Sequence, residues 1–251
     1  MTLVVKGLTV RFGSTVVVDD VSFEVGSTER LGIIGASGSG KSVTALTIAG
    51  LLSETAQVSG SIQWDGRELV GMRDRDYRKL RGSDISMVFQ EPMTALDPTM
   101  RVGRQIAEVI ALHEQRSGKR RTVVEELVRV GFTEPERIAD SYPHQLSGGQ
   151  RQRALIAMAI VNKPGLVICD EPTTALDVIV QRQILHVLDE VLTQRSALFI
   201  SHDLAVVKEI CSRVIVMQDG RIVEEGPIDR IIERPQCEYT ARLIAAARGE
   251  L

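Results

Sequence analysis

Eight residues near position 40 combine glycines, a lysine and a serine in a spacing that suits phosphate binding. The stretch GASGSGKS, residues 35–42, fits the pattern G-x-x-x-x-G-K-[ST] in full. The glycines let backbone N–H groups wrap around phosphate oxygens, the Lys41 ammonium can reach β and γ oxygens, and the Ser42 hydroxyl can ligate Mg²⁺. An apolar run precedes the loop and a helical pattern follows it, so we expect strand, phosphate loop and helix in that order. The residues expected to contact a bound triphosphate here are Gly35, Ala36, Ser37, Gly38, Ser39, Gly40, Lys41, Ser42 and Val43.

Two adjacent carboxylates follow another apolar run. The segment LVICDE, residues 166–171, predicts a buried strand that ends in Asp170 and Glu171. We expect Asp170 to hold Mg²⁺, directly or through water, and Glu171 to act as the base that takes a proton from the attacking water. Paired acids after a strand are often only solvated surface, but this pair follows a phosphate loop at a plausible distance along the chain.

Three single residues are weaker candidates for the same chemistry. Gln90 ends the predicted strand ISMVFQ, where its amide could touch the metal or the lytic water. His202 follows the predicted strand SALFIS, where an imidazole could face a γ-phosphate. Phe12 is the best aromatic residue for stacking on an adenine ring. A lone Gln is weak evidence by itself, and His202 and Phe12 also have ordinary structural interpretations, as a core histidine and a core phenylalanine.

A second glycine motif stands just before a helix that is both basic and apolar. Its residues are Ser147, Gly148, Gly149 and Gln150. Exposed N–H groups at a helix start attract anions, yet one nucleotide needs only one cradle. We therefore expect this motif to contact the triphosphate held by the Lys41 loop of a second molecule, with two copies facing head to tail.

The order of predicted elements indicates an α/β fold. The opening segments LVVKGLTVRF and TVVVDDVSFEV alternate as antiparallel strands do, and two hairpins are expected at Asp65-Gly66 and Asp219-Gly220. Helical patterns replace strand patterns from about residue 101. We expect a single domain over 1–251, with a nucleotide-binding core and β-subdomain in 1–95 and 161–251 and a helical subdomain in about 96–160.

Composition excludes several classes of protein. A formal net charge of -3 over 251 residues gives no general attraction to nucleic acid. No stretch approaches the roughly 18 apolar residues of a membrane span, and no secretory signal pattern opens the chain. The three cysteines are scattered without metal-ligand spacing, which favours a reduced compartment. Residues 162–165, NKPG, lack the acidic residue of a guanine-specifying motif, so the sequence does not support a GTP-binding switch protein.

The whole chain resembles the ATPase subunit of an ABC transporter. The phosphate loop, Gln90, LSGGQRQR, LVICDEPTTALD and His202 occur in the family's order. The resemblance implies ATP with Mg²⁺ and a P-loop NTPase core that carries an N-terminal antiparallel β-subdomain and an inserted α-helical subdomain. It also implies that Asp177 lies at the junction of two ATPase subunits and that the turn after Gln90 contacts a membrane subunit. The adenine-stacking residue of the family is commonly Tyr, and Phe12 fills that position here.

A finer resemblance is to the peptide and nickel importer branch. It is carried by FQEPMTALDPTM, YPHQLSGGQRQR, DEPTTALDV and ERPQCEYTARLIAA. It implies an energy-coupling ATPase for peptides, nickel or a related small solute, peripheral on the cytoplasmic face of the inner (plasma) membrane. Its partners would be a second ATPase subunit, identical or related, and two transmembrane permease subunits, with an extracytoplasmic solute-binding protein acting indirectly.

Two other functions compete with import. A soluble ABC-type ATPase acting on nucleic acid or ribosomes usually shows coiled-coil arms, zinc cysteines or two fused cassettes, and the sequence shows none of them. Its one basic cluster, RSGKRR at 116–121, suits a solvated loop better. A small-molecule kinase would leave LSGGQ and His202 unexplained. The sequence leaves open the solute and whether the two ATPase subunits are identical.

Overall fold

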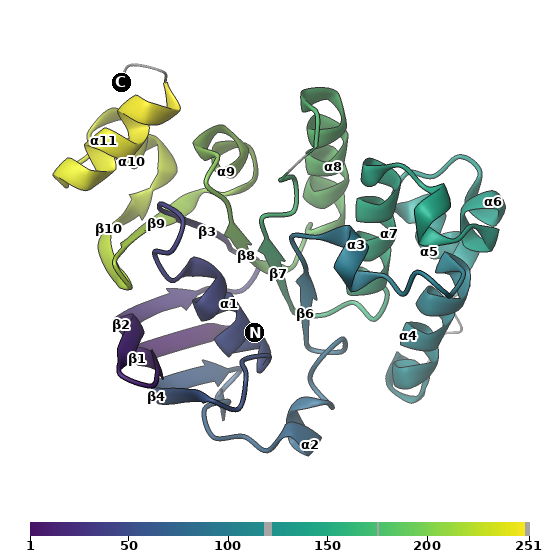
Figure 1. The fold of residues 1–251 in the computed structure, drawn as a ribbon, viewed down its shortest axis with the longest axis horizontal. Helices are drawn as coiled ribbons and strands as arrows, with labels where there is room; N and C mark the ends of the chain where they lie inside the picture. The colour runs from purple at the N-terminus through teal and green to yellow at the C-terminus, as the bar shows by residue number, and fades with distance from the viewer. Residues whose placement is uncertain (118–121, 175, 249–251) are drawn as a thin grey trace. The chain divides into compact units, whose positions relative to one another are not determined.

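The computed structural model describes residues 1–117, 122–174 and 176–248. Two compact units emerge from the contacts between residues: unit 1 comprises Met1–Lys79 and Gln194–Leu251, and unit 2 comprises Leu80–Thr193. Figure 1 shows the ribbon with its element labels. The basic cluster at 116–121 lies mostly outside the described residues.

Unit 1 contains an antiparallel sheet in the order β2-β1-β4-β5. The strands are β1 (Leu3–Phe12), β2 (Thr15–Val25), β4 (Ala56–Trp64) and β5 (Arg67–Glu68). The buried residues of β1 are Leu3, Val5, Leu8 and Val10, so the alternation expected for a sheet with one face on the core shifts by one residue at the irregular pairing between Val5 and Leu8. The turn at Asp65-Gly66 has positive φ at both residues, 51° and 78°, which is the geometry that hairpin turns prefer. The first two strands and this hairpin confirm the sequence prediction.

The other strands of unit 1 are mostly parallel. Strand β3 (Arg30–Ile34) lies between β8 (Ser196–Ile200) and β9 (Arg213–Gln218) and is parallel to both, while β10 (Arg221–Pro227) pairs antiparallel with β9. The helices of unit 1 are α1 (Lys41–Ala49), α2 (Asp74–Tyr77), α9 (Leu204–Ile210), α10 (Ile228–Glu233) and α11 (Glu238–Ala247). The predicted hairpin at Asp219-Gly220 is confirmed.

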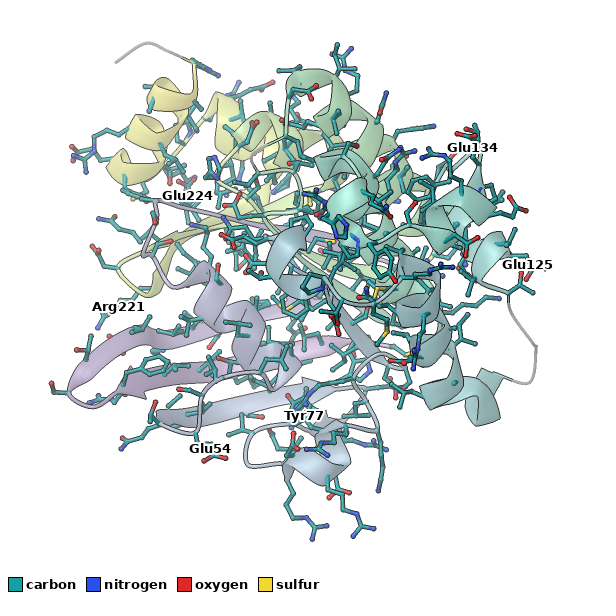
Figure 2. The ribbon with its side chains drawn as sticks, turned by 45° about the vertical axis from the view of Figure 1, so that its right-hand side comes forward. Glu54, Tyr77, Glu125, Glu134, Arg221 and Glu224 are labelled. Atoms are coloured by element: carbon teal, nitrogen blue, oxygen red, sulfur yellow. The ribbon has the colours of Figure 1, made fainter. Side chains whose placement is uncertain are left out.

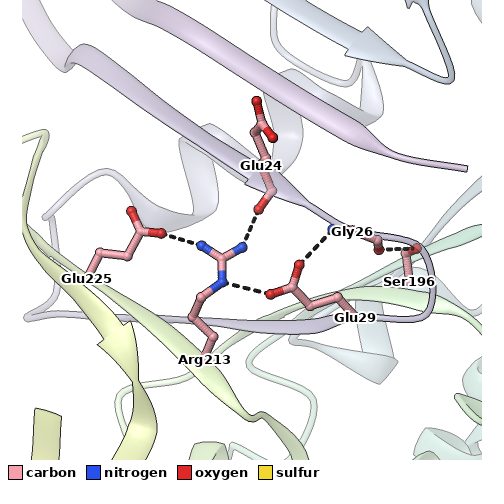
Figure 3. Close-up of polar contacts among 6 residues, drawn as sticks. All are labelled: Glu24, Gly26, Glu29, Ser196, Arg213 and Glu225. Carbon is pink, nitrogen blue, oxygen red and sulfur yellow. Dashed lines mark hydrogen bonds and ion pairs between the residues drawn. The ribbon is translucent and has the colours of Figure 1, made fainter. Parts of the chain in front are cut away.

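Arg213 of β9 joins three acceptors in unit 1, as Figure 3 shows. Its Nε donates to the Glu29 carboxylate at 2.7 Å, and its other nitrogens donate to the Glu225 carboxylate and to the backbone carbonyl of Glu24. Glu29 also accepts the N–H of Gly26 at 2.6 Å. Burial raises the pKa of Glu29, but the hydrogen bonds from Arg213 and Gly26 outweigh burial, so the pKa stays below its ordinary value. The cluster therefore ties the end of β2 to β9 and β10.

Unit 2 contains two parallel strands and a group of helices. The strands are β6 (Ile85–Val88) and β7 (Leu166–Asp170). The helices are α3 (Pro92–Ala95), α4 (Val102–Ser117), α5 (Val123–Arg129), α6 (Pro135–Asp140), α7 (Gly148–Ile160) and α8 (Val178–Val191), with a 3-10 turn at Pro143–Gln145. Helices α4 to α7 gather together in Figure 1. Strand β6 is shorter than predicted, because Phe89 and Gln90 lie beyond its end.

No helix within the described ranges is both long enough and apolar enough to cross a bilayer.

Candidate nucleotide site

The phosphate loop holds its lysine in place. Lys41 is the first residue of α1, and its side chain is buried, with only 7% of the residue exposed. Its Nζ donates to the carbonyl oxygens of Gly35 at 2.8 Å and Ala36 at 2.9 Å. These two bonds fix the ammonium beside the N-terminus of α1, where the helix dipole also favours an anion. The predicted order of strand, loop and helix is confirmed.

Two positions of the loop require glycine because backbone atoms of other strands lie too close for a Cβ atom. A Cβ at Gly35 would lie 2.2 Å from the carbonyl oxygen of Met217, and one at Gly40 would lie 2.8 Å from that of Val17. Gly40 also has φ of 97°, in the left-handed region that favours glycine. Larger residues at these positions would push the loop away from β2 and β9, so the shape of the loop depends on glycine.

One buried hydroxyl of the loop lacks a partner. The Oγ atom of Ser39 is buried and makes no hydrogen bond to any described residue. Leaving a buried polar group unpaired costs about 1–3 kcal/mol. Ala36, Ser37 and Gly38 are exposed, whereas Ser42 and Val43 are half-buried. The loop thus offers an unused hydroxyl beside exposed backbone, as a loop that receives a polar ligand would.

The two carboxylates predicted in unit 2 are both buried. Asp170 is the last residue of β7 and Glu171 follows it, with 6% and 7% of each residue exposed. Glu171 has φ of 49°, an uncommon value for a side chain other than glycine, and its Oε2 accepts from the Thr174 hydroxyl at 2.7 Å. The local turn therefore aims the Glu171 side chain and fixes one of its oxygens. Sequence analysis missed Thr174, although it lies within DEPTTALD.

The second glycine motif forms the N-terminus of α7. The Ser147 hydroxyl accepts the N–H of Gln150 at 3.3 Å, and the Gln150 side chain accepts the N–H of Ser147 at 3.0 Å. This reciprocal pair is a capping box. Ser147 and Gly148 are exposed, Gln150 is half-buried, and Gly149 is buried. The motif thus presents its first two residues on the surface of unit 2.

The remaining candidate residues end strands or begin helices. In unit 2, Asp177 caps α8 by accepting the N–H groups of Ile179 and Val180, and Gln90 is exposed two residues after β6. In unit 1, His202 is exposed two residues after β8, and Phe12 is half-buried at the end of β1.

Each unit therefore carries one set of the predicted residues. Unit 1 holds Phe12, the loop of residues 35–43 and His202. Unit 2 holds Gln90, the motif at 147–150, the acids at 170–171 and Asp177. Among the described residues, no group of three or more His, Cys, Asp or Glu side chains is placed to hold a metal ion.

Sequence analysis missed one residue next to the phosphate loop. The Tyr239 hydroxyl, from α11, accepts the backbone N–H of Ala36 at 2.9 Å. The two residues are 203 positions apart, and no spacing pattern connects them.

Comparisons with known proteins agree on one family. A family model described as ABC transporter matches residues 18–174. The peptidoglycan transport ATP-binding protein YejF of Agrobacterium fabrum is 48% identical, over 99% of this chain and 47% of that protein. The dipeptide transport ATP-binding protein DppD of Haemophilus influenzae is 46% identical, over 96% of this chain and 76% of that protein.

A solved structure shares the fold. The chain superposes on the dimeric structure of MJ0796, described as a bacterial ABC transporter cassette, with a TM-score of 0.77 and 26% identity over 90% of this chain and 98% of that one. The same cassette has been solved bound to ADP and Pi, and there the TM-score is 0.75. The predicted α/β fold class is therefore confirmed.

The chain spans less than half the length of the first relatives that it matches, 47% of YejF and 38% of the oligopeptide transport ATP-binding protein OppD of Mycobacterium tuberculosis. It covers 72% of the dipeptide transport protein DppD of Lactococcus lactis, at 44% identity. With the family model matched from residue 18 to residue 174, these relationships show that the chain is a member of the ABC transporter family.

Proposed function

We propose that this chain is the ATP-hydrolysing, energy-coupling subunit of an ABC importer for peptides or a related small solute such as nickel. The observation that carries the proposal is the phosphate loop, in which two backbone carbonyls hold the Lys41 ammonium at the start of α1. The names of the relatives support a transport role and peptides as the cargo. They do not favour the alternative of an ATPase that acts on nucleic acid or ribosomes.

The loop supports binding of the ATP phosphates. Its N–H groups would donate hydrogen bonds to the phosphate oxygens, the Lys41 ammonium would offset the charge of the β and γ oxygens, and Ser39 offers a buried hydroxyl that bonds to no described residue. Phe12, half-buried at the end of β1, would stack on the adenine ring through its exposed part.

The oxygen ligands in the predicted set suit Mg²⁺. A hydroxyl from Ser42, an amide oxygen from Gln90 and a carboxylate from Asp170 are all hard donors, and Mg²⁺ is usually bound through one or two carboxylates together with substrate phosphates and water. Bound there, the ion would neutralise charge on the phosphates. The lack of a cluster of three acidic or imidazole groups among the described residues is compatible with such a site.

Glu171 is the proposed general base. The residue is buried, and the bond from the Thr174 hydroxyl fixes the orientation of the carboxylate that would accept a proton from water. His202 and Gln90 would orient the γ-phosphate and the lytic water, respectively. These roles follow from residue chemistry and from the family pattern, and each can be tested by substituting the residue.

We further propose that ATP is enclosed between two ATPase subunits. Ser147 and Gly148 are exposed at the start of α7, as residues that contact a partner's nucleotide must be. Asp177, which caps α8, would lie at the junction. Two transmembrane permease subunits would receive the motion through the turn after Gln90, and a solute-binding protein would act outside the membrane. The chain would then lie on the cytoplasmic face of the inner membrane.

The proposed functional division follows the predicted boundaries. Residues 1–95 and 161–251 would form the nucleotide-binding core with its β-subdomain, and about 96–160 would form the helical subdomain that carries the second glycine motif. Helices α4 to α7 all fall within that second range, which supports the division.

Solute uptake by cells that carry a variant of this chain tests the function. Replacing Lys41 with Ala should abolish ATP hydrolysis by the purified chain and uptake of labelled di- and oligopeptides by cells. The matched control is Lys79→Ala, because Lys79 is an exposed lysine outside the predicted site and pairs with Asp76, three residues before it. If the Lys41 variant lost nickel uptake but kept peptide uptake, nickel would be identified as the cargo in place of peptides. Unchanged hydrolysis in the Lys41 variant would refute the proposal.

A further inference from the structure

One side chain of the C-terminal helix α11 forms a hydrogen bond to the phosphate loop. Tyr239, the second residue of α11, is half-buried, and its hydroxyl accepts the N–H of Ala36 at 2.9 Å. Both residues belong to unit 1. The roles proposed above for the nucleotide site make no use of this contact.

The contact falls on the peptide group that also holds Lys41. The N–H of Ala36 and the carbonyl of Gly35 belong to one planar peptide unit. Its carbonyl accepts from Lys41 Nζ at 2.8 Å, and its N–H donates to Tyr239. Since the unit is rigid, rotation at one end moves the other. A hydrogen bond at the N–H also polarises the carbonyl and strengthens its bond to the ammonium.

The segment before α11 is anchored independently of the loop. The Glu224 carboxylate of β10 accepts the N–H groups of Gln236 at 3.0 Å and Cys237 at 3.1 Å. Figure 2 labels Glu224 close to the C-terminal helices. Burial raises the pKa of Glu224, but hydrogen bonds, including that from Gln236, outweigh it and lower the pKa overall. The carboxylate therefore stays charged at neutral pH and fixes the start of α11.

Helix α11 is also held by packing. Thr240, next to Tyr239, is fully buried, and Ile244 is only 3% exposed. With Thr240 and Ile244, one turn apart on the same face of the helix, both buried, and the start of the helix tied to β10, the Tyr239 hydroxyl has little freedom to leave Ala36.

We propose that Tyr239 is a positioning residue for the phosphate loop: it fixes the Gly35–Ala36 peptide, which in turn fixes the Lys41 ammonium for the nucleotide phosphates. This inference rests on the proposed ATP-binding function. The C-terminal helix then tunes the affinity for ATP without touching the nucleotide.

Removal of one oxygen atom tests the inference. Tyr239→Phe keeps the ring and removes the acceptor of the Ala36 N–H. The loss of one hydrogen bond should raise the Kd for ATP of the purified chain by about 3- to 10-fold. Exchange of the Ala36 amide hydrogen should become faster in the same variant.

The matched control is Tyr77→Phe. The Tyr77 hydroxyl donates to the carbonyl of Ile48 at 3.0 Å and is buried, so this variant also loses one hydrogen bond in unit 1. It should lower the melting temperature and leave the Kd for ATP unchanged. A merely structural role for Tyr239 would make the two variants behave alike.

A double-mutant cycle separates this inference from the function on which it rests. In a Lys41→Ala background, Tyr239→Phe should change the Kd for ATP very little, because the hydroxyl acts through the missing ammonium. An equal loss of affinity in both backgrounds, or an unchanged Kd in Tyr239→Phe alone, would overturn the role of Tyr239. If instead the unaltered chain bound no ATP, or Lys41→Ala bound it equally well, the proposed function itself would fail.

Discussion

Gly149 and Val180 lie so close that only a glycine fits at the first position. A Cβ built on Gly149 would stand 2.4 Å from Cγ1 of Val180. The second glycine motif therefore packs the start of α7 against α8, in addition to the contact with a second subunit that is proposed for it.

Replacing Gly149 with Ala should destabilise the chain. The overlap with Val180 would force the two helices apart at a cost of about 1–3 kcal/mol, measurable as a lower midpoint in urea. Gly148→Ala is the matched control, since its Cβ would lie 3.5 Å from Leu176 in ordinary contact. Equal stability of the two variants would contradict this account of the packing.

Replacing Glu171 with Gln should slow hydrolysis and spare binding. Loss of a general base lowers turnover by about 10²–10⁴-fold, while the phosphate loop is untouched. ATP should then trap a dimer, visible by light scattering after size-exclusion chromatography. Glu190→Gln, at an exposed carboxylate of α8, should hydrolyse ATP at the normal rate. A Glu171 variant with normal turnover would exclude it as the base.

The cluster around Arg213 predicts a loss of stability in acid. Burial raises the pKa of Glu29, but the hydrogen bonds from Arg213 and Gly26 together lower it by a larger amount. The pKa in the folded chain therefore lies below the ordinary value of 4.5. The unfolded chain then binds more protons, and the stabilisation is present above pH 4.5 and is lost as the pH falls through the folded pKa.

Glu29→Gln should therefore flatten the decline of unfolding free energy below pH 4.5. Glu24→Gln is its control, because Arg213 contacts only the backbone carbonyl of Glu24. Urea unfolding curves between neutral pH and pH 3 would measure both. Equal acid sensitivity in the Glu29 variant and the unaltered chain would contradict the assignment.

Thiol labelling should distinguish the three cysteines. Cys169 and Cys211 are buried, and burial raises the pKa of the Cys211 thiol to about 12, whereas Cys237 is half-buried. A thiolate is the reactive species, so the native chain should react rapidly at Cys237 alone. Cys237→Ser should abolish the rapid phase of labelling. Rapid labelling of Cys211 would contradict the prediction, because it would show that the residues around Cys211 open readily.

Local sequence patterns predicted the elements that carry the site. The phosphate loop, the first two strands and both Asp-Gly turns follow from short-range rules: glycine where φ is positive, alternation on a half-buried strand, and apolar runs for buried strands. The strand before Gln90 was predicted two residues too long, because Phe89 is apolar but lies beyond the last paired residue, Val88.

Contacts between distant residues could not be predicted in this way. Nothing in the sequence relates Tyr239 to Ala36 or Val180 to Gly149, since such pairs depend on how helices dock after folding. Glu171 was predicted from its place after a strand, but its positive φ and its bond to Thr174 depend on the turn that follows β7.

Mixing two inactive variants tests the central claim, that each ATP is completed by a second subunit. Ser147→Arg blocks the motif and Lys41→Ala disables the loop, so each chain alone should be inactive. In an equal mixture, random pairing should restore about a quarter of the normal rate, because half of the dimers hold one intact site of two. A mixture no more active than its parts, while the unaltered chain keeps its full specific activity on extreme dilution, would contradict the claim.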